Sequence, residues 1–261
     1  MRTIEEVIKN VTAPDEQMFQ AAEARWNTVA KPLGGLGVFE EMITRIAALR
    51  GSQDFRLAQR ALLVFCSDNG VVAEGVTQCG SEVTAKVAAA IAENRGTASA
   101  LAKSLNCCVI PVDMGILDFP GHPGVRNLRV RNGTGDISVE PAMTEEECRE
   151  AMARGAALTE ELARKGTEIL AVGEVGIGNT TTATALAAAL LALDPEEITG
   201  RGAGLSSEGL ERKKTAIRRA LARCKADADD PVGLTAELGG LDIAAMCGAF
   251  LGAAACRIPV I

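Results

Sequence analysis

The stretch GEVGIGNTTT, Gly173 to Thr182, joins an apolar run to the start of a helical one. The run before it, EILAVG (168–173), is short and largely apolar, as expected of a strand that is buried on both faces of a parallel sheet. After the glycines, Asn179 and three threonines begin a segment with helical character. This order of strand, glycine loop and helix predicts one βα unit of a doubly wound α/β fold.

The same alternation extends along most of the chain. Three further apolar runs predict strands: ALLVFC (61–66), CCVIPV (107–112) and RIPVI (257–261). Helical spacing predicts helices at about 83–105, 144–165, 180–193, 207–226 and 241–256. Strands that alternate with helices predict a mostly parallel sheet with helices on both faces. Because the last run reaches the final residue, we expect it to be an edge strand, or the chain to be a fragment.

The segment before the first strand is helical in pattern. Thr3 and Glu6 form a possible capping box, a second helix follows Asp15, and a third follows the turn KPLGGLG (31–37) and ends near Gly51. We therefore expect a small helical part at residues 1–50 and a large Rossmann-like α/β domain at residues 51–261.

Composition limits the function classes. Lys and Arg number 27 against 34 Asp and Glu, giving a formal net charge of −7 without a basic tract, which argues against a nucleic-acid partner. No apolar run is long enough to cross a membrane, and the N-terminus does not resemble a signal peptide. The 8 cysteines form no CxxC pair, so we expect free thiols in the cytoplasm. With a single histidine, a zinc site and a Ser-His-Asp triad are both disfavoured.

The glycine loop has the spacing of a P-loop, G-x-x-x-x-G-N-T, but Asn179 stands where the lysine should be. A β/γ-phosphate clamp is therefore not expected, which argues against a kinase or NTPase. A helix start with free N–H groups still suits one monophosphate. The alternative is a simple tight βα turn with Asn179 as N-cap. Lys213 could supply the missing positive charge, or it could be a solvated surface lysine.

Other polar residues near predicted strand ends are candidates for the chemistry. Glu174 precedes the glycine loop and could accept a proton or hold a cationic ring, or could be a surface glutamate. Asp68 and Asn69 follow the first strand, where ligand contacts or a turn are expected. We expect His122 to be structural. Gly248 and Gly252 lie four residues apart, which predicts close packing of a helix on the sheet.

Taken together, several segments resemble the nicotinate-nucleotide–dimethylbenzimidazole phosphoribosyltransferase family, whose members take part in the assembly of the cobalamin lower ligand. The matching segments keep their order over nearly the whole chain: KPLGGLG, SDNGVVAEGV, VRNLRVRNGTGDI, GEVGIGNTTTATA, GRGAGL with EGLERK, and GGLDIAAMCGAFLGAAACRIPV. The resemblance implies transfer of the phosphoribosyl group of nicotinate mononucleotide to 5,6-dimethylbenzimidazole or a similar base. It implies no cofactor and no metal, and a homodimer.

The resemblance also implies roles for individual residues. The phosphate would be held by Gly176, Gly178, Asn179, Thr180, Gly202, Ala203 and Lys213. The base pocket would be lined by Cys79, Ser81, Val175 and Ile177, and Glu174 would be the polar or basic group that faces the reacting rings.

Three departures from the family pattern affect these expectations. The family commonly has DHG where this chain has Asp68-Asn69-Gly70, and a proline-containing strip where it has Gln78 to Ser81. Family members also continue past Ile261, in a segment that carries the glutamate usually assigned as catalytic base and the C-terminal helices that complete the small helical part. If 261 residues are the whole chain, we expect phosphate binding with weak or absent catalysis. The alternative function is a non-catalytic mononucleotide-binding protein derived from this fold.

Overall fold

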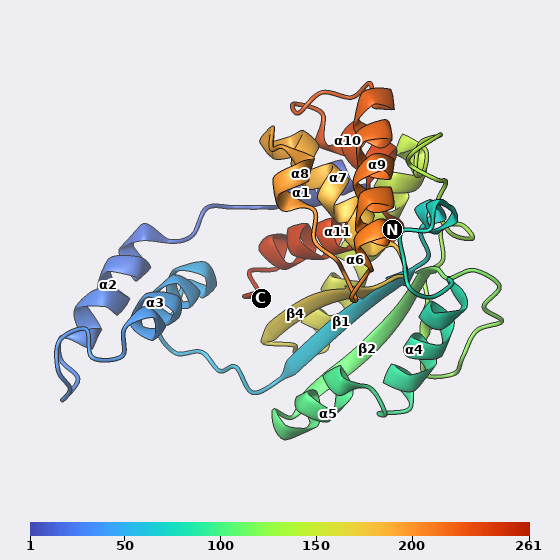
Figure 1. Cartoon of the computed structure of the whole chain (residues 1–261). Coiled ribbons are helices and arrows are strands. Elements are labelled where there is room, and N and C mark those ends of the chain that lie inside the picture. Colours follow the sequence, from blue (N-terminus) through green and yellow to red (C-terminus); the bar gives the residue numbers. More distant parts are fainter.

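A computed structural model describes residues 1–261 and shows a parallel four-stranded sheet at the centre of the molecule (Figure 1). The strands are β1 (Arg60–Ser67), β2 (Cys107–Gly115), β3 (Arg126–Asn127) and β4 (Ile169–Val175), in the spatial order β3-β2-β1-β4. The central strand β1 pairs in parallel with β2 on one side and with β4 on the other. The three longer strands confirm the predicted apolar runs, whereas β3 lies outside all the predicted strands.

The last residues of the chain lie beside β4 at the edge of the sheet. Leu170 and Val260 form an isolated parallel bridge, and the Ile261 N–H donates to the Leu170 carbonyl at 2.9 Å. The run 257–261 is therefore at an edge position, as expected, although it forms a bridge and not a full strand.

Helices cover both faces of the sheet, which confirms the predicted doubly wound α/β architecture. Alternate residues of β1 point to opposite sides, as a strand requires. Leu63 and Phe65 join the large core under α6 (Glu145–Arg164) and α11 (Leu241–Ala255). Val64 and Cys66 join a smaller core under α4 (Glu82–Ala92), which is followed by α5 (Thr97–Ser104) on the same face.

The prediction of one helix over about 83–105 is wrong, because this stretch forms two helices, α4 and α5. Asn94 breaks the helix with a φ of 58°, a left-handed conformation that Asn tolerates better than most residues. Gly96 then serves as the N-cap of α5. The break lets α5 turn back and contact β2 beside α4.

Gly248 and Gly252 pack α11 against α6, and not principally against the sheet as predicted. A Cβ placed on Gly248 would lie 1.9 Å from the Met152 carbonyl oxygen, and one on Gly252 would lie 2.9 Å from the Ala156 Cα. The two backbones thus approach so closely that neither position has room for a side chain. This contact fixes α11 and hence the segment at its N-terminus.

We expect Gly248→Ala to destabilise the fold. Alanine favours a helix over glycine by about 1 kcal/mol, but overpacking against an immovable backbone carbonyl costs about 1–3 kcal/mol or more. The net change should appear as a lower urea midpoint with an unchanged slope. Gly200→Ala is the matched control, because a Cβ there meets nothing within 4 Å. A Gly248→Ala variant as stable as this control would contradict the packing argument.

A lobe of helices lies beyond the carboxyl ends of the strands, at the top of Figure 1. It contains α7 (Asn179–Leu191), α8 (Pro195–Ile198), α9 (Ser207–Arg223) and α10 (Pro231–Leu238). Asp230 caps α10 with Pro231 at its first turn, and Thr144 forms a capping box with Glu147 at the start of α6, both as predicted. A short 3-10 helix, η1 (Gly70–Glu74), follows β1 toward this lobe.

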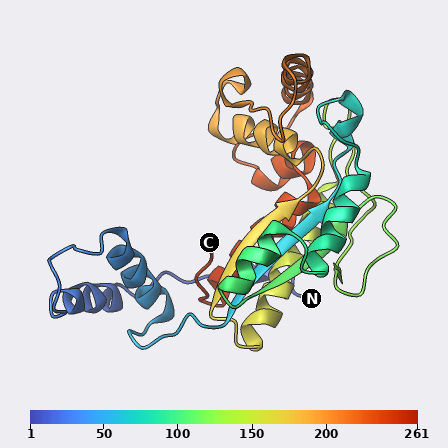
Figure 2. The same cartoon turned by 60° about the horizontal axis from the view of Figure 1, so that its bottom comes forward.

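The N-terminal helices divide between two places. The helices α2 (Glu16–Trp26) and α3 (Val38–Arg50) pack on each other and project away from the α/β body (Figures 1 and 2). The first helix, α1 (Ile4–Ile8), instead packs on α6 and α11, because Ile4 and Val7 are buried in the large core. In this respect the structure differs from the predicted helical part at 1–50, since α1 belongs to the larger body.

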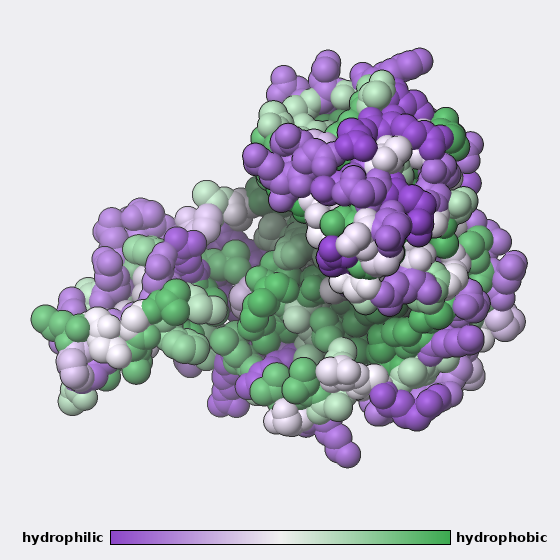
Figure 3. Space-filling view, in the orientation of Figure 1, coloured by the Kyte–Doolittle hydropathy of each residue, from purple (hydrophilic) through white to green (hydrophobic).

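Hydrophobic side chains are exposed over the middle of the face shown in Figure 3, beneath the lobe that contains α7–α10. Exposed large hydrophobic residues in the chain include Val38 and Phe39 of α3, Leu101 of α5, Leu105 just after α5, and Leu191 of α7. None of the helices combines the length and apolar character needed to cross a membrane. All 8 cysteines are free thiols, as predicted.

Candidate phosphate and base site

The glycine loop connects β4 to α7 at the carboxyl edge of the sheet. Gly178, with a φ of 95°, is the N-cap of α7, and Asn179 is its first helical residue. The alternative in which Asn179 caps the helix is therefore wrong. The Asn179 side chain instead accepts from the N–H of Thr180 at 2.7 Å and donates to a carboxylate oxygen of Glu174.

The N–H groups in the first turn of α7 are less available than expected. Those of Asn179, Thr180 and Thr181 already donate within the loop. Four other N–H groups of the predicted phosphate site have no acceptor in the protein: those of Gly176, Gly178, Gly202 and Ala203. Since main-chain N–H groups of glycine loops bind phosphate oxygens well, these four are the donors that a phosphate could engage.

Lys213 lies on α9 and is buried, with only 1% of its surface exposed. Its Nζ donates to Thr180 Oγ1 at 2.8 Å and to the Gly200 carbonyl at 3.1 Å. A Cβ on Gly202 would lie 3.0 Å from Thr180 Oγ1 and 3.7 Å from Lys213 Nζ, so the two glycine-rich turns meet at this ammonium group. The alternative of a solvated surface lysine is wrong for Lys213.

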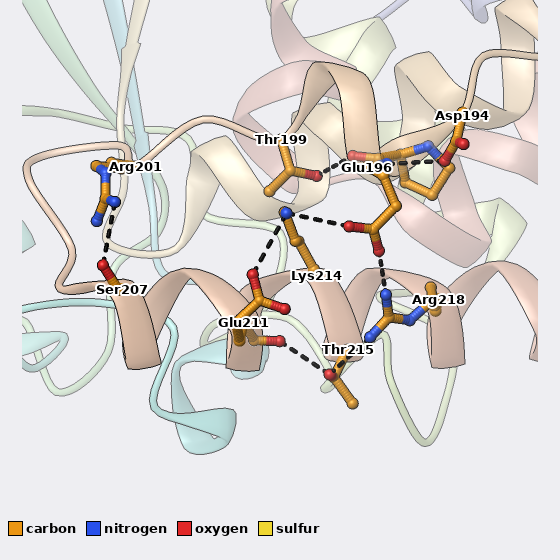
Figure 4. A network of polar contacts seen from close by, with 10 residues as sticks. Asp194, Glu196, Thr199, Arg201, Ser207, Glu211, Lys214, Thr215 and Arg218 are labelled. Atoms are coloured by element: carbon orange, nitrogen blue, oxygen red, sulfur yellow. Dashed lines mark hydrogen bonds and ion pairs between the residues drawn. The ribbon is translucent and has the colours of Figure 1, made fainter.

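Its neighbour Lys214 is half-buried and is paired with carboxylates. Figure 4 shows the Lys214 ammonium between two carboxylates, Glu196 at 3.0 Å and Glu211 at 3.3 Å.

Burial lowers the pKa of Lys213, because the charged form loses hydration that its two neutral acceptors replace only in part. An anion bound beside Lys213 would favour the charged form again.

Glu174 is half-buried near the end of β4, beside the loop, and the alternative of a surface glutamate is wrong. Burial raises the pKa of its carboxyl group, and the hydrogen bond from Asn179 acts in the opposite direction. A carboxylate with a raised pKa is a better proton acceptor than an exposed one. Glu174 therefore has the environment of a general base next to the candidate phosphate cradle.

The predicted base-pocket residues occupy two neighbouring segments. Val175 ends β4 and packs against the core under α4, and Ile177 lies within the glycine loop. Cys79 is exposed in the turn before α4, and Ser81 is the N-cap of that helix. No side-chain hydrogen bond joins Cys79 or Ser81 to Glu174, and their role stays a prediction.

Gln78 was not among the predicted site residues, although it adjoins that strip. Its Nε2 donates to the Gly204 carbonyl, which follows the predicted phosphate-binding residues 202–203. Arg212 makes a second bridge, from its Nε to the Gly75 carbonyl at 3.0 Å. The segment 75–78 is thereby tied to the turn at 202–204 and to α9, the helix that carries Lys213.

Two further residues that sequence reasoning missed hold the glycine loop from below. The Ile177 N–H donates to Thr84 Oγ1 at 3.1 Å, and Thr84 in turn donates to the buried carboxylate of Asp68. Asp242 lies fully buried at the start of α11, under Gly176. Nothing in the local pattern marks a threonine or an aspartate in these helices, and only the fold brings them to the loop.

Fold and site together define a doubly wound α/β protein with a candidate anion cradle and a half-buried carboxylate at the carboxyl edge of its parallel sheet. This is where open α/β sheets bind ligands. A model of a family described as phosphoribosyltransferase matches residues 11–261. The chain belongs to the nicotinate-nucleotide–dimethylbenzimidazole phosphoribosyltransferase family.

The similarity extends over nearly the whole chain. The enzyme of that name from Acetivibrio thermocellus is 38% identical over 98% of this chain and 73% of its own length, and that from Clostridium tetani is 34% identical over 100% and 72%. A crystal structure of CobT from Thermus thermophilus superimposes with a TM-score of 0.89, at 38% identity, over 94% of this chain and 73% of that one. The resemblance seen in the sequence is thus confirmed.

Proposed function

We propose that this protein transfers the 5-phosphoribosyl group of nicotinate mononucleotide to 5,6-dimethylbenzimidazole or a similar base. The products are nicotinate and α-ribazole 5′-phosphate, used in synthesis of the cobalamin lower ligand. The observation that carries the proposal is the meeting of Lys213, Thr180 and Gly202 beside Glu174, in a chain of this family. Such a cradle suits a single 5′-phosphate, with a reacting ring held near the carboxylate.

The chemistry needs few protein groups. A benzimidazole nitrogen forms a bond to the anomeric carbon, and the bond from that carbon to the nicotinate nitrogen breaks. The electron pair of the broken bond returns to the nicotinate nitrogen, which is cationic in the substrate, so no acid is needed. The benzimidazole releases its ring proton, and Glu174 is the group we assign to accept it. Positioning of the phosphate and the two rings supplies the rest of the rate enhancement.

The direct test is incubation of the chain with nicotinate mononucleotide and 5,6-dimethylbenzimidazole, followed by chromatography and mass spectrometry. We expect ribazole phosphate and nicotinate in equal amounts, and neither when the base is omitted. Calorimetric binding of the mononucleotide without any product would favour the alternative, a non-catalytic mononucleotide-binding protein. No binding and no product would contradict both.

We expect Glu174→Gln to lower kcat by about 100-fold, the lower end of the range for loss of a general base, with little change in KM. The amide keeps an oxygen that can accept from Asn179, so the loop should be preserved. Because a base must be ionised and burial raises the pKa of Glu174, wild-type kcat should fall as the pH drops through that raised pKa. Glu174→Gln should lose this acid limb.

Glu197→Gln is the control for that variant, since Glu197 is exposed on α8 and makes no side-chain hydrogen bond. Equal kcat in the Glu174 and Glu197 variants would show that Glu174 is not the base in the proposed reaction.

We further propose a cytoplasmic homodimer. The free thiols suit a reducing compartment, and the exposed side chains of α3, α5 and α7 offer an apolar surface for a second copy. Sedimentation velocity should give twice the mass of the 27.1 kDa chain. Phe39→Glu on α3, where Phe39 is 65% exposed, should yield a folded monomer if that surface forms the interface.

A further inference from the structure

Beneath the glycine loop lie two buried side chains whose hydrogen bonds are incomplete. Asp242 is 0% exposed and Asn69 is 1% exposed. Asp242 Oδ2 and Asn69 Oδ1 have no hydrogen-bond partner. An unpaired buried polar atom costs about 1–3 kcal/mol, so two of them in one place require an explanation.

The two side chains are neighbours. A Cβ on Gly176 would lie 3.1 Å from both Asn69 Nδ2 and Asp242 Oδ2. A Cβ on Gly240 would lie 2.9 Å from Asn69 Oδ1 and 2.2 Å from Asp242 Oδ1. Both side chains therefore touch the same two glycines, with the amide and the carboxyl group side by side.

The donors around them do not reach the two unpaired oxygens. Asn69 Nδ2 donates to the Ile177 carbonyl at 3.3 Å and makes no hydrogen bond to Asp242 Oδ2, and Asp242 Oδ1 accepts from the Ile243 N–H at 2.9 Å. An ionised carboxylate offers only acceptors, and so does an amide oxygen. One proton on the carboxyl group of Asp242 supplies an O–H donor beside Asn69 Oδ1, which lies next to this carboxyl group at Gly240.

We propose that Asp242 is a positioning residue, a neutral carboxylic acid that donates its O–H to Asn69 and so fixes the Ile177 carbonyl of the phosphate loop. Ile177 is then held at both ends: its N–H by Thr84 and its carbonyl by Asn69. These two hydrogen bonds hold the loop that carries Gly176 and Gly178 in one conformation, the one that a phosphate would bind.

The electrostatic surroundings agree with a neutral carboxyl group. The charged group with the largest effect is Glu174 on β4, followed by Asp68 after β1, and both would repel a second negative charge. The thiol of Cys66 on β1 is the other titratable group nearby, and no cation pairs with Asp242. Burial first, and then Glu174, raise the pKa of Asp242 to about 7.

The proton can be detected without any assay of activity. With ¹³C-labelled aspartate carboxyl groups, one buried carboxyl resonance of the wild-type protein should titrate near pH 7, and Asp242→Asn should remove it. The infrared band of a protonated carboxyl group should weaken in the same variant. Titration of every aspartate in the ordinary acidic range, or a spectrum unchanged by Asp242→Asn, would overturn the proposal.

Stability gives a second readout with a defined sign. Between the ordinary pKa of an unfolded aspartate and about 7, folded Asp242 keeps a proton that the unfolded chain has released. The folded state therefore loses stability as pH rises through this interval. Asp242→Asn retains the donor and has no proton to lose, so its Tm relative to wild type should increase between about pH 5 and about pH 8.

Asp230→Asn is the matched control, an exposed aspartate at the start of α10 that accepts from the Gly233 N–H at 2.9 Å. Its Tm difference from wild type is the baseline with which the Asp242→Asn difference is compared at each pH. Parallel curves of Tm against pH for Asp242→Asn and wild type would contradict a protonated Asp242 carboxyl group.

The effect on ligand binding rests on the proposed function. Asp242→Asn should bind nicotinate mononucleotide as wild type does at about pH 6 and more tightly than wild type at about pH 9. Asp242→Ala should raise KM about tenfold, with a smaller change in kcat, since the clamp acts on the loop and not on the reacting rings. Equal affinities at both pH values would refute the positioning role. A chain that binds no mononucleotide would contradict the proposed function. The carboxyl resonance and the pH dependence of Tm would still test whether Asp242 carries a proton.

Discussion

Lys213→Ala is expected to weaken binding of nicotinate mononucleotide about 10- to 100-fold. A hydrogen bond to a charged group contributes about 1.5–3 kcal/mol, and each 1.4 kcal/mol corresponds to a factor of about ten. Lys213 Nζ lies where the two glycine-rich turns meet, within 2.8 Å of Thr180 Oγ1. No other lysine or arginine nitrogen donates to Thr180 or Gly200.

The substitution is best measured by calorimetry with two ligands, nicotinate mononucleotide and the riboside that lacks the phosphate. Only the mononucleotide should lose affinity. Because the Lys213 stem is buried, Lys213→Met should be tested as well, since it keeps the aliphatic packing and removes the charge. Lys214→Ala is the control, as its ammonium pairs with Glu196 and Glu211 on the surface (Figure 4). An equal loss for both ligands would contradict a phosphate contact.

Gly176→Ala is expected to abolish measurable mononucleotide binding and to lower stability. A Cβ there would lie 2.1 Å from the Ser67 carbonyl oxygen, a backbone atom at the end of β1 that cannot move without disturbing the sheet. It would also press on Asn69 Nδ2 and Asp242 Oδ2 at 3.1 Å. Overpacking of this kind costs about 1–3 kcal/mol, or about 2–4 °C in Tm for each kcal/mol in a chain of this size.

Gly173→Ala provides the comparison three residues earlier on β4, where a Cβ meets nothing within 4 Å. It should keep both Tm and affinity near the wild-type values. Near wild-type Tm and affinity in Gly176→Ala, as in Gly173→Ala, would contradict the close packing of the loop against β1 and α11.

Much of the fold could be predicted from the sequence, because local patterns carry it. The apolar runs at 61–66, 107–112 and 168–173 are strands, and the Thr144–Glu147 capping box does start a helix. The break at Asn94 escaped prediction, since apolar spacing continues on both sides and only a backbone dihedral marks it. Likewise, the spacing of Gly248 and Gly252 predicts a close contact but does not name the partner, which is α6.

For the candidate site, the glycine loop was identified by its position after a strand, Glu174 by its place just before the loop, and Lys213 by resemblance to the family. The sequence left Lys213 open between a cradle and the surface, and only the structure shows that its side chain is buried. Thr84, Gln78 and Asp242 gave no usable signal, because each acts through a partner far away in the sequence, such as Ile177 for Thr84.

By itself, the sequence determined that a strand, a glycine loop and a helix succeed one another at 168–193, and that this βα unit belongs to a doubly wound sheet. These features depend on residues a few positions apart, whose propensities and periodicity act locally. Only the tertiary structure decided which N–H groups stay free, which lysine is buried, and that Asp242 lies beneath Gly176. Those outcomes depend on burial and on contacts between distant segments, since desolvation and hydrogen bonding are set by what the folded chain places nearby.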